Sequence, residues 1–419
     1  MSARAPSETS HRLPILFILI TVMIDAMGIG LIMPVMPDLI REVSAGGLGQ
    51  AAIWGGILSS SFAVMQFLFA PMIGRLSDAF GRRPVLLVSL LVMAADYIVV
   101  ALAGTVWLLL AGRIIGGITA ATHSTAFAYM ADISSGEEKA KRFGFIGAAF
   151  GLGFVLGPGL GGLMAEFGTR APFYMAAALA FTNAIFGWMV LPETVTDKTR
   201  RAFRLKGVNP LSAFVTLSQL PAIRPLSAVY FLYQIATVVY PAVWAYFATE
   251  RFNWTPGMIG VSLMLYGIGA AFVQGVLVGP VIARLGQRGA VMFGLLIEVA
   301  TFGLLGFISS GLITLILTPF IAIGNVGLPA LQGIVSQTVP DDSQGELQGV
   351  LSSITSIGMI IGPLVLTQIF AWATADGGAI YLPGAPFLLS GVFMSIAVVI
   401  FLKSSPKTVA TQDVPKGAK

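Results

Sequence analysis

The second half of this chain repeats its first half at a constant offset of about 205 residues. Seven glycine, proline and arginine positions recur in register, which is unlikely by chance. Because Gly and Pro constrain backbone geometry rather than solubility, the register predicts two copies of one fold, facing each other across a pseudo-two-fold axis. The matching pairs are Gly74 and Gly279, Gly81 and Gly286, Arg83 and Arg288, Gly144 and Gly349, Gly153 and Gly358, Gly157 and Gly362, and Pro158 and Pro363.

The composition predicts that most of the chain lies in lipid. Hydrophobic residues make up 56% of the sequence and charged residues only 10%, which leaves too little polar surface for a soluble globule. Apolar runs of about 20 residues are long enough to cross a hydrocarbon core about 30 Å thick as helices. Twelve such runs are expected, at Pro14–Pro37, Ile53–Ile73, Pro84–Ala103, Val106–Met130, Phe143–Ala165, Ala171–Leu191, Pro225–Ala248, Met258–Ile282, Ala290–Ser309, Leu312–Val339, Leu347–Ala373 and Tyr381–Leu402.

These runs predict an all-α membrane protein with twelve transmembrane helices in two pseudo-symmetric bundles of six. We expect the bundles to occupy residues 1–191 and 225–403. Residues 192–224 form the one long polar stretch between them and predict a basic cytoplasmic linker. The polar residues 404–419, like Ser2–His11, lack periodicity and predict disordered ends.

The distribution of basic residues predicts the orientation. With the amino terminus in the cytoplasm, 20 of the 24 Lys and Arg residues fall on the cytoplasmic side. Arg41, Arg170 and Arg251 fall outside, and Arg113 lies within a span. The positive-inside rule therefore places both termini in the cytoplasm. The net charge of +5 then matches the anionic inner leaflet, and no nucleic-acid partner is needed to explain it.

Several function classes are excluded by what the sequence lacks. Cysteine is absent, and His11 and His123 are the only histidines. Disulfides and thiolate metal sites are therefore excluded, and a zinc or haem enzyme with histidine ligands is hard to build. The predicted loops are too short for a ligand-binding or catalytic domain outside the membrane, so we expect neither an enzyme nor a receptor.

Four charged residues fall inside the predicted spans: Asp25, Asp96, Arg113 and Glu298. A charge at mid-membrane costs about 2.5 to 3.5 kcal/mol on insertion scales, so such residues usually face a cavity or one another. Three acids and one base leave an excess of negative charge, and desolvation should keep at least one acid protonated part of the time. A carboxyl poised in this way can carry a proton. The alternative is a fixed structural pair between Arg113 and one acid.

A polar loop, GRLSDAFGRRP, begins at Gly74 after the second predicted span. Gly74 and Gly81 permit a tight turn, and Pro84 suits the first position of the next helix. Asp78 can accept hydrogen bonds from a helix amino terminus in the other half, which would hold the cytoplasmic side closed until the halves rock apart. The second copy has Ala283 in place of Asp78, so this latch is asymmetric. The alternative is an ordinary topology-setting loop.

Glycines recur at four-residue spacing in the fifth predicted span, at Gly153, Gly157 and Gly161. Such spacing clears one face of a helix so that a neighbouring backbone can approach closely. Pro158 removes one backbone donor and favours a bend. We interpret this span as a helix at the moving interface, with static packing as the alternative. The second half carries a thinner copy, at Gly358, Gly362 and Pro363.

These motifs resemble those of the major facilitator superfamily. The loop at 74–84 resembles its hallmark cytoplasmic loop, and GFVLGPGLGG at 153–162 resembles the fifth-helix motif of its drug/proton antiporters. DAMGIGLIMP at 25–34 is similar to the first helix of the bacterial tetracycline/proton antiporters. The resemblance extends over nearly the whole chain, with further matches at Met65-Gln66, Gly112-Arg113-Ile114, Ala131-Asp132-Ile133 and Leu347-Gln348-Gly349.

The resemblance implies roles for the residues that match the family's motifs. It places Asp25 and Gln66 near the substrate, Asp96 in the transport path, and Arg113 as a charge partner. Glu298 takes the place of an important ninth-helix aspartate, with a side chain one methylene longer. The implied gating residues are Gly74, Ser77, Asp78, Gly81, Arg82 and Arg83, with Asp132 as a further cytoplasmic-side acid.

Two departures from the family pattern concern the substrate. Ala270 stands where several tetracycline exporters carry an eighth-helix histidine, and His123 stands where a small residue is usual. His123 is a candidate substrate-binding residue because histidine can titrate near neutral pH, and the alternative is a packing residue, which is the commoner role of a lone membrane histidine. For the candidate substrate-binding amides, helix packing is the equal alternative. They are Gln66, Gln234, Gln274, Asn325 and Gln332.

We therefore expect a proton-coupled antiporter, functional as a monomer, that exports a drug-like amphipathic compound. The resemblance suggests tetracycline or its metal chelate, so a divalent metal is expected only as part of the substrate, and no cofactor is expected. A proton and the substrate would favour different states of Asp25 and Glu298. The alternative is a major facilitator that imports or exports a metabolite, although an importer should lack the glycine-rich fifth helix.

Overall fold

The computed structural model describes residues 12–120, 122–197, 200, 203, 223–340, 343–375, 377–378 and 380–404, leaving aside the side chains at positions 123, 137 and 140. The expected disordered ends and most of the predicted linker therefore fall outside the described residues. Within these ranges all regular structure is helical, as expected for an all-α membrane protein.

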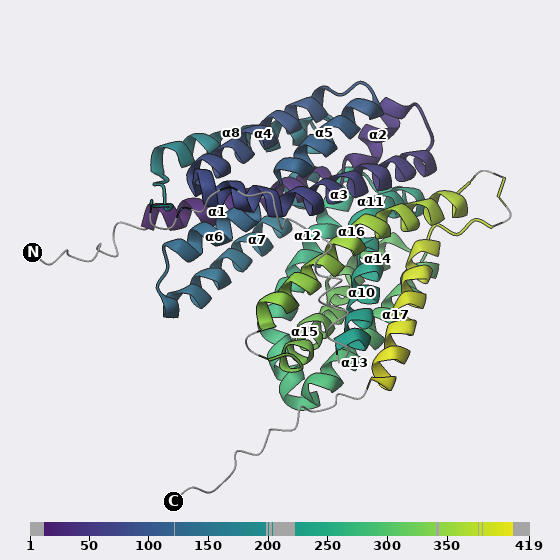
Figure 1. Cartoon of the computed structure of the whole chain (residues 1–419). Coiled ribbons are helices and arrows are strands. Elements are labelled where there is room, and N and C mark those ends of the chain that lie inside the picture. Colours follow the sequence, from purple (N-terminus) through teal and green to yellow (C-terminus); the bar gives the residue numbers. More distant parts are fainter. Residues whose placement is uncertain are drawn as a thin grey trace, which may run out of the picture.

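The first half of the chain forms one lobe of helices that lie side by side (Figure 1). Its fourth span is interrupted, because α5 ends at Thr119 and α6 begins at Thr122. The elements of this N-terminal lobe are α1 (Arg12–Ile32), α2 (Met36–Ser44), α3 (Leu48–Phe80), α4 (Arg82–Leu102), α5 (Val106–Thr119), α6 (Thr122–Asp132), α7 (Gly136–Ala165) and α8 (Ala171–Val190).

The second half forms the C-terminal lobe, in which several spans change helix type. A π-helical segment, η3, interrupts the eighth span, and a 3-10 segment, η4, interrupts the tenth. The elements are α10 (Arg224–Thr237), α11 (Val239–Phe252), α12 (Pro256–Phe272), η3 (Val273–Leu277), α13 (Val278–Phe307), α14 (Gly311–Ile321), η4 (Ala322–Val326), α15 (Gly327–Gln337), α16 (Gln344–Ala373) and α17 (Ala385–Lys403).

The predicted twelve membrane crossings are confirmed. The described residues contain 11 helical runs that are long and apolar enough to span a membrane, and one of them, Pro256–Phe307, has 52 residues. At 1.5 Å per residue a straight helix of that length would measure about 78 Å, far more than a bilayer core of about 30 Å. The run is instead broken at Gly286, which has non-helical dihedral angles, so it crosses twice.

Matching glycines make the turns after the second and eighth spans. Gly81 has a φ of +113° and Gly286 a φ of +69°, a left-handed region that favours glycine. These two residues are 205 positions apart (286 − 81), so the repeat seen in the sequence is also a repeat of backbone conformation.

The turn at Gly81 is tighter than the sequence suggested. Helix α3 continues to Phe80 and α4 begins at Arg82, so Gly74 lies inside a helix and Pro84 is the third residue of α4 rather than the first. Helix α3 stays regular to its end because the Gly81 N–H donates to the Ser77 carbonyl at 3.1 Å. Gly81 alone reverses the chain.

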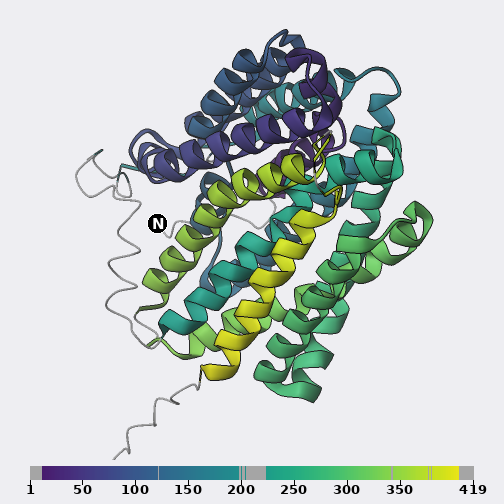
Figure 2. The ribbon, with the colours of Figure 1, turned by 90° about the vertical axis from the view of Figure 1, so that its right-hand side faces the viewer.

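The two lobes meet along two helix pairs, α3 with α16 and α7 with α12. Figure 2 shows α16 in yellow-green running alongside the dark purple α3. A Cβ added at Gly260 would overlap the Pro158 carbonyl oxygen, and one at Gly56 would lie 2.9 Å from the Pro363 carbonyl oxygen. Because Pro158 and Pro363 are matching positions of the repeat, the lobes touch through equivalent surfaces.

The glycine stripe of the fifth span packs inside its own lobe. A Cβ at Gly153, Gly157 or Gly161 would crowd successive carbonyl oxygens of α1, those of Met23, Met27 and Leu31. In this state the stripe packs on α1, while α7 also contacts α12 of the other lobe, so a role of this helix at a moving interface stays a prediction. Two other residues of α7, Pro158 and Gly162, contact the opposite lobe. A Cβ added at Gly162 would lie 2.8 Å from the Pro256 carbonyl oxygen of α12.

The lobes are in contact at one end of the molecule and diverge toward the end that carries the start of α1 and the end of α17 (Figure 1). At mid-height Ser60 Oγ still donates across the interface to the Ile360 carbonyl, at 2.7 Å. Nearer the diverging end, a Cβ added at Gly74, Gly147 or Gly349 would meet no described atom within 4 Å.

Candidate functional site

A cavity of about 270 Å³ lies between the lobes, and most of its wall belongs to the C-terminal lobe. The N-terminal lobe contributes Met33, which follows α1, and Phe154 of α7. A mostly aromatic and aliphatic wall with a few amides suits an amphipathic ligand. The remaining lining residues are Tyr233, Gln234, Thr237, Tyr240, Pro241, Leu263, Tyr266, Gln274, Asn325 and Leu328.

Interrupted helices bring two of the predicted amides to this cavity. Gln274 lies in the π-helical segment η3 and Asn325 in the 3-10 segment η4. The break between α5 and α6 falls at Ala120, 205 positions before Asn325 (325 − 120), so matching helices of the two repeats are interrupted at the same place. Discontinuous helices at corresponding positions commonly mark the binding site of a transporter.

Gln66 contacts the break in the N-terminal lobe rather than the cavity. Its side-chain amide donates to the Ala120 carbonyl at 3.2 Å, which satisfies a backbone acceptor freed where α5 ends. Gln66 is not among the residues that line the cavity.

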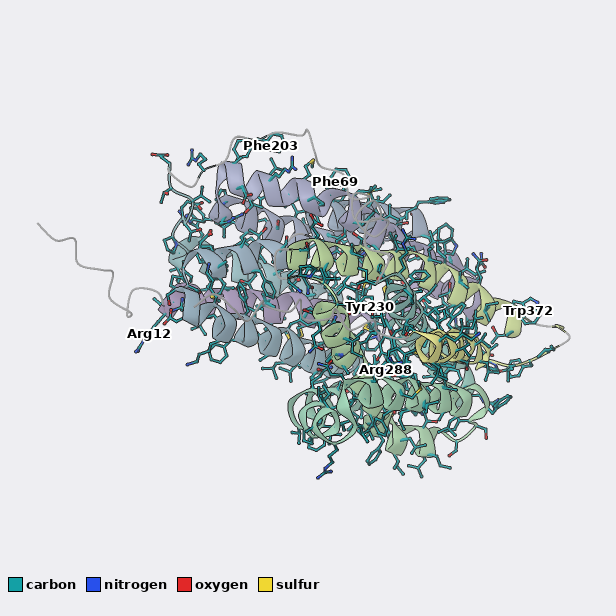
Figure 3. All side chains as sticks on the ribbon, turned by 60° about the horizontal axis from the view of Figure 1, so that its bottom comes forward. Arg12, Phe69, Phe203, Tyr230, Arg288 and Trp372 are labelled. Carbon is teal, nitrogen blue, oxygen red and sulfur yellow. The ribbon has the colours of Figure 1, made fainter. Side chains whose placement is uncertain are left out.

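Three of the other four predicted amides belong to two hydrogen-bonded chains in the C-terminal lobe. Asn325 donates to the Tyr266 hydroxyl at 3.2 Å and accepts from the Tyr233 hydroxyl at 3.5 Å. The second chain begins at Gln234, which donates to Thr355 Oγ1 at 2.8 Å. Thr355 Oγ1 lies 3.2 Å from the Tyr230 hydroxyl, and this hydroxyl accepts from Gln332 at 3.3 Å. Figure 3 shows Tyr230 in the middle of the molecule.

Glu298 is buried behind the cavity wall. It is 1% exposed and lies on α13. Its Oε2 accepts from the Tyr240 hydroxyl at 3.3 Å, while its Oε1 is buried without a hydrogen-bond partner among the described residues. No described Lys or Arg forms a salt bridge with it. A buried carboxyl with one hydrogen bond and no cation is suited to holding a proton.

Asp96 and Arg113 form an ion pair, which the sequence analysis gave as an alternative without naming the acid. Arg113 Nη2 lies 2.6 Å from Asp96 Oδ2, and the side chains are 13% and 5% exposed. The guanidinium also lies over the Phe62 ring, 5.6 Å from its centroid. Gly112 and Gly116 leave room for the carboxylate, because a Cβ at either would lie within 3 Å of an Asp96 oxygen.

Asp25 is not among the residues that line the cavity. It lies on α1, is partly exposed and forms no salt bridge within the described residues. The side chain of His123 lies outside the described residues. The structure therefore brings together Gln234, Gln274 and Asn325 around the cavity with Glu298 directly behind it, and leaves Asp25 out of that lining.

The predicted gating loop forms one polar network around Arg82. The guanidinium pairs with Asp78 at 2.5 Å and with Asp132 at 3.2 Å, and it donates to Ser77 Oγ at 2.9 Å. Arg83 donates instead to the Trp188 carbonyl at 2.7 Å. Asp78 thus bonds within its own lobe, and the latch to the other half stays a prediction for a state in which the diverging ends meet.

Glu193 is a member of this network that the sequence analysis missed. Its carboxylate accepts from the backbone N–H of Arg82 at 2.9 Å and of Arg83 at 3.2 Å, the first two residues of α4. The next residue, Thr194, donates to Asp132 at 3.0 Å. The start of the linker is therefore fastened to the gating loop. The sequence signal was an acid two residues after the sixth predicted span, which is common in an ordinary cytoplasmic loop.

Removing the Glu193 carboxylate should loosen the gating loop. We expect Glu193→Ala to cost about 0.5 to 2 kcal/mol, as for the loss of a helix N-cap, because two N–H groups at the start of α4 lose their acceptor. Because the chain has no cysteine, an Ala79→Cys background reports the loop without interference. The maleimide labelling rate of that cysteine should rise about threefold to tenfold.

Glu166 provides the matched control for this measurement. It ends α7 with an exposed side chain that forms no ion pair within the described residues, so Glu166→Ala should leave the labelling rate unchanged. Equal rates in the Glu193 and Glu166 variants would show that the carboxylate does not hold the loop.

Comparisons with known proteins agree with this geometry. The family model described as Major Facilitator Superfamily matches residues 18–242 and again 226–419. The class C tetracycline resistance protein of Escherichia coli is 40% identical over 387 residues, covering 90% of this chain and 97% of that protein. The class G protein of Vibrio anguillarum is 39% identical over 88% of this chain and 93% of its own length. A bacterial homologue of the human lysosomal transporter Spinster, solved in an inward-facing unoccupied conformation, matches in fold with a TM-score of 0.75 at 16% identity, covering 95% of this chain and 97% of that one.

Proposed function

Because the chain belongs to the major facilitator superfamily, we propose that it is a proton-coupled antiporter that exports a drug-like amphipathic compound, with tetracycline or its metal chelate as the first candidate. It is an integral membrane protein that resembles bacterial inner-membrane efflux proteins. We propose that a single chain is the working unit, because the cavity is built from the two lobes of one molecule.

The observation that carries this proposal is a buried carboxyl without a cation, next to an aromatic cavity between two lobes. Glu298 has one hydrogen bond, from Tyr240, which itself lines the cavity. An uncompensated acid at this depth is costly unless it is neutralised. Either a proton or a positively charged substrate neutralises it, which makes their binding mutually exclusive.

The arrangement of the lobes supports a state that is open to the cytoplasm. The lobes diverge toward the end that carries the start of α1 and the end of α17 (Figure 1), which the positive-inside rule assigns to the cytoplasm. In this state the substrate enters the cavity from inside the cell. Rocking of the lobes about the α3–α16 and α7–α12 contacts would then open the opposite end.

Coupling to protons gives the cycle its direction. Substrate binding releases the proton from the coupling acids to the cytoplasm, and protonation from outside releases the substrate. We propose Glu298 and Asp25 as these acids. One proton entering through about 150 mV supplies roughly 3.5 kcal/mol, which sustains a substrate gradient of about a few hundred-fold.

Inverted membrane vesicles test the proposal directly, because their outer surface is the cytoplasmic face. With an acid interior, vesicles that contain the protein should accumulate labelled tetracycline or ethidium above the level in vesicles without it. An ionophore that collapses the pH gradient should abolish this accumulation. A metabolite importer would give the opposite result. Inverted vesicles would accumulate no drug, and right-side-out vesicles alone would show proton-driven uptake of the metabolite.

A further inference from the structure

We propose that Tyr240 is the positioning residue through which substrate in the cavity controls the proton on Glu298. Glu298 does not line the cavity, whereas Tyr240 does, and the Tyr240 hydroxyl donates to Glu298 Oε2 at 3.3 Å. The substrate therefore cannot touch the carboxyl in this state. Among the described residues that line the cavity, Tyr240 is the one that hydrogen-bonds to Glu298. This inference rests on the proposed exchange of protons for substrate at Glu298.

The backbone seals the other side of the Glu298 carboxyl. Gly324, in the 3-10 segment η4, packs against it so closely that an added Cβ would overlap Oε1 and lie 2.6 Å from Cδ. Oε1 is buried and has no hydrogen-bond partner among the described residues. Movement of Tyr240 or of η4 would expose this carboxyl to water, and Tyr240 is a single side chain on the cavity wall.

Tyr240 also lines a smaller hollow beside the cavity. That second hollow shares Tyr240, Leu263 and Tyr266 with the cavity and is otherwise lined by Trp244, Ser262, Thr318 and Ile321. The ring packs on Tyr266 at 5.3 Å and on Phe302 at 5.6 Å between centroids. A ligand that displaces this ring would break the bond to Glu298 and open the wall in one movement.

Within the part of the chain that the structure describes, no charged side chain pairs with Glu298. Its titratable neighbours are the phenols of Tyr233 on α10, Tyr240 on α11 and Tyr266 on α12. The segments η3, α14, η4 and α15, which pack on α13, carry no titratable side chain, and α17 carries only Lys403, its last residue. The Tyr240 hydroxyl is thus the one hydrogen-bond donor described for the Glu298 carboxyl.

The proton balance of the proposed step is simple. When substrate moves Tyr240, water enters, the carboxylic acid gives its proton to that water, and the carboxylate remains. The hydronium leaves by the open end of the cleft. On the return, a proton from outside neutralises the carboxylate and Tyr240 bonds to it again. The tyrosine itself keeps its proton throughout.

Tyr240→Phe tests this inference, because it keeps the ring and removes the hydroxyl. A hydrogen bond to a carboxylate stabilises the charged form, so its loss should move the midpoint of proton-driven transport to higher pH by about one unit. Substrate-induced proton release from purified protein near pH 7, followed with a pH dye after addition of tetracycline, should fall by at least about half.

Tyr266→Phe is the matched control. Tyr266 lines the same cavity and packs against the Tyr240 ring, but its hydroxyl bonds to Asn325 rather than to Glu298. This variant should weaken drug binding without moving the pH midpoint. Equal midpoint shifts in both variants, or none in Tyr240→Phe, would overturn the role of Tyr240.

The wild-type chain separates this inference from the proposed function, and it also provides a test if Tyr240→Phe does not fold. Wild-type protein that drives no proton-coupled transport ends both proposals. The wild-type protein could instead transport substrate but release no more protons on addition of tetracycline than the Glu298→Gln blank. That result would keep the antiporter proposal and refute the role of Tyr240.

Discussion

Replacing Glu298 with Gln is expected to abolish proton-driven accumulation of substrate while leaving folded protein in the membrane. Gln has the shape of the protonated acid and can keep the bond from Tyr240, but it has no proton to release. The gradient sustained in energised inverted vesicles should fall from as much as about a few hundred-fold to none. Exchange of labelled for unlabelled tetracycline without a gradient should continue, because the lobes can still rock with a neutral side chain.

Glu250→Gln is the control for this result. Glu250 lies near the end of α11 in the same lobe and accepts from Tyr381 at 2.8 Å, outside the cavity wall. It should retain uphill transport. If Glu298→Gln still concentrates the drug, coupling must reside in Asp25, and Asp25→Asn should then be the variant that loses it.

The sequence predicted the features that depend on residues close together along the chain. Apolar runs of about 20 residues predicted the twelve crossings, because lipid leaves the backbone no partner except its own helix. The paired glycines predicted the turns at Gly81 and Gly286, since both turns need a positive φ. The excess of acids over bases inside the spans predicted an unpaired carboxyl, and Glu298 has no cationic partner among the described residues.

Features that depend on packing between distant segments could not be predicted in this way. Glu193 caps a helix that begins 111 residues earlier in the chain, and nothing near it in the sequence indicates that partner. The glycine stripe that begins at Gly153 predicted that another helix packs closely on it, but not which one. That helix is α1 of the same lobe. Tyr240 was missed because one tyrosine among many aromatic residues in a span gives no signal until Glu298 is placed beside it.

The second large effect is expected from Arg113→Leu, which should destabilise the folded protein by about 3 to 5 kcal/mol. The substitution removes the guanidinium 2.6 Å from Asp96 Oδ2 and leaves a carboxylate that is 5% exposed without a cation. Asp96 Oδ1 already has no hydrogen-bond partner among the described residues, so little else can stabilise the charge. Thermal unfolding of the purified protein, followed by tryptophan fluorescence, measures the loss.

Two further variants separate buried charge from lost packing. Adding Asp96→Asn to Arg113→Leu removes the stranded charge and should recover most of the lost stability, because replacing both partners of a buried pair is far less costly than removing one. Glu42→Gln breaks the exposed pair between Arg170 and Glu42, whose side chains are 30% and 50% exposed, and leaves the bond from Arg170 to the Ala101 carbonyl in place, so it should cost less than about 1 kcal/mol. If the double variant is as unstable as Arg113→Leu alone, the contact of Arg113 with the Phe62 ring, rather than its charge, stabilises the N-terminal lobe.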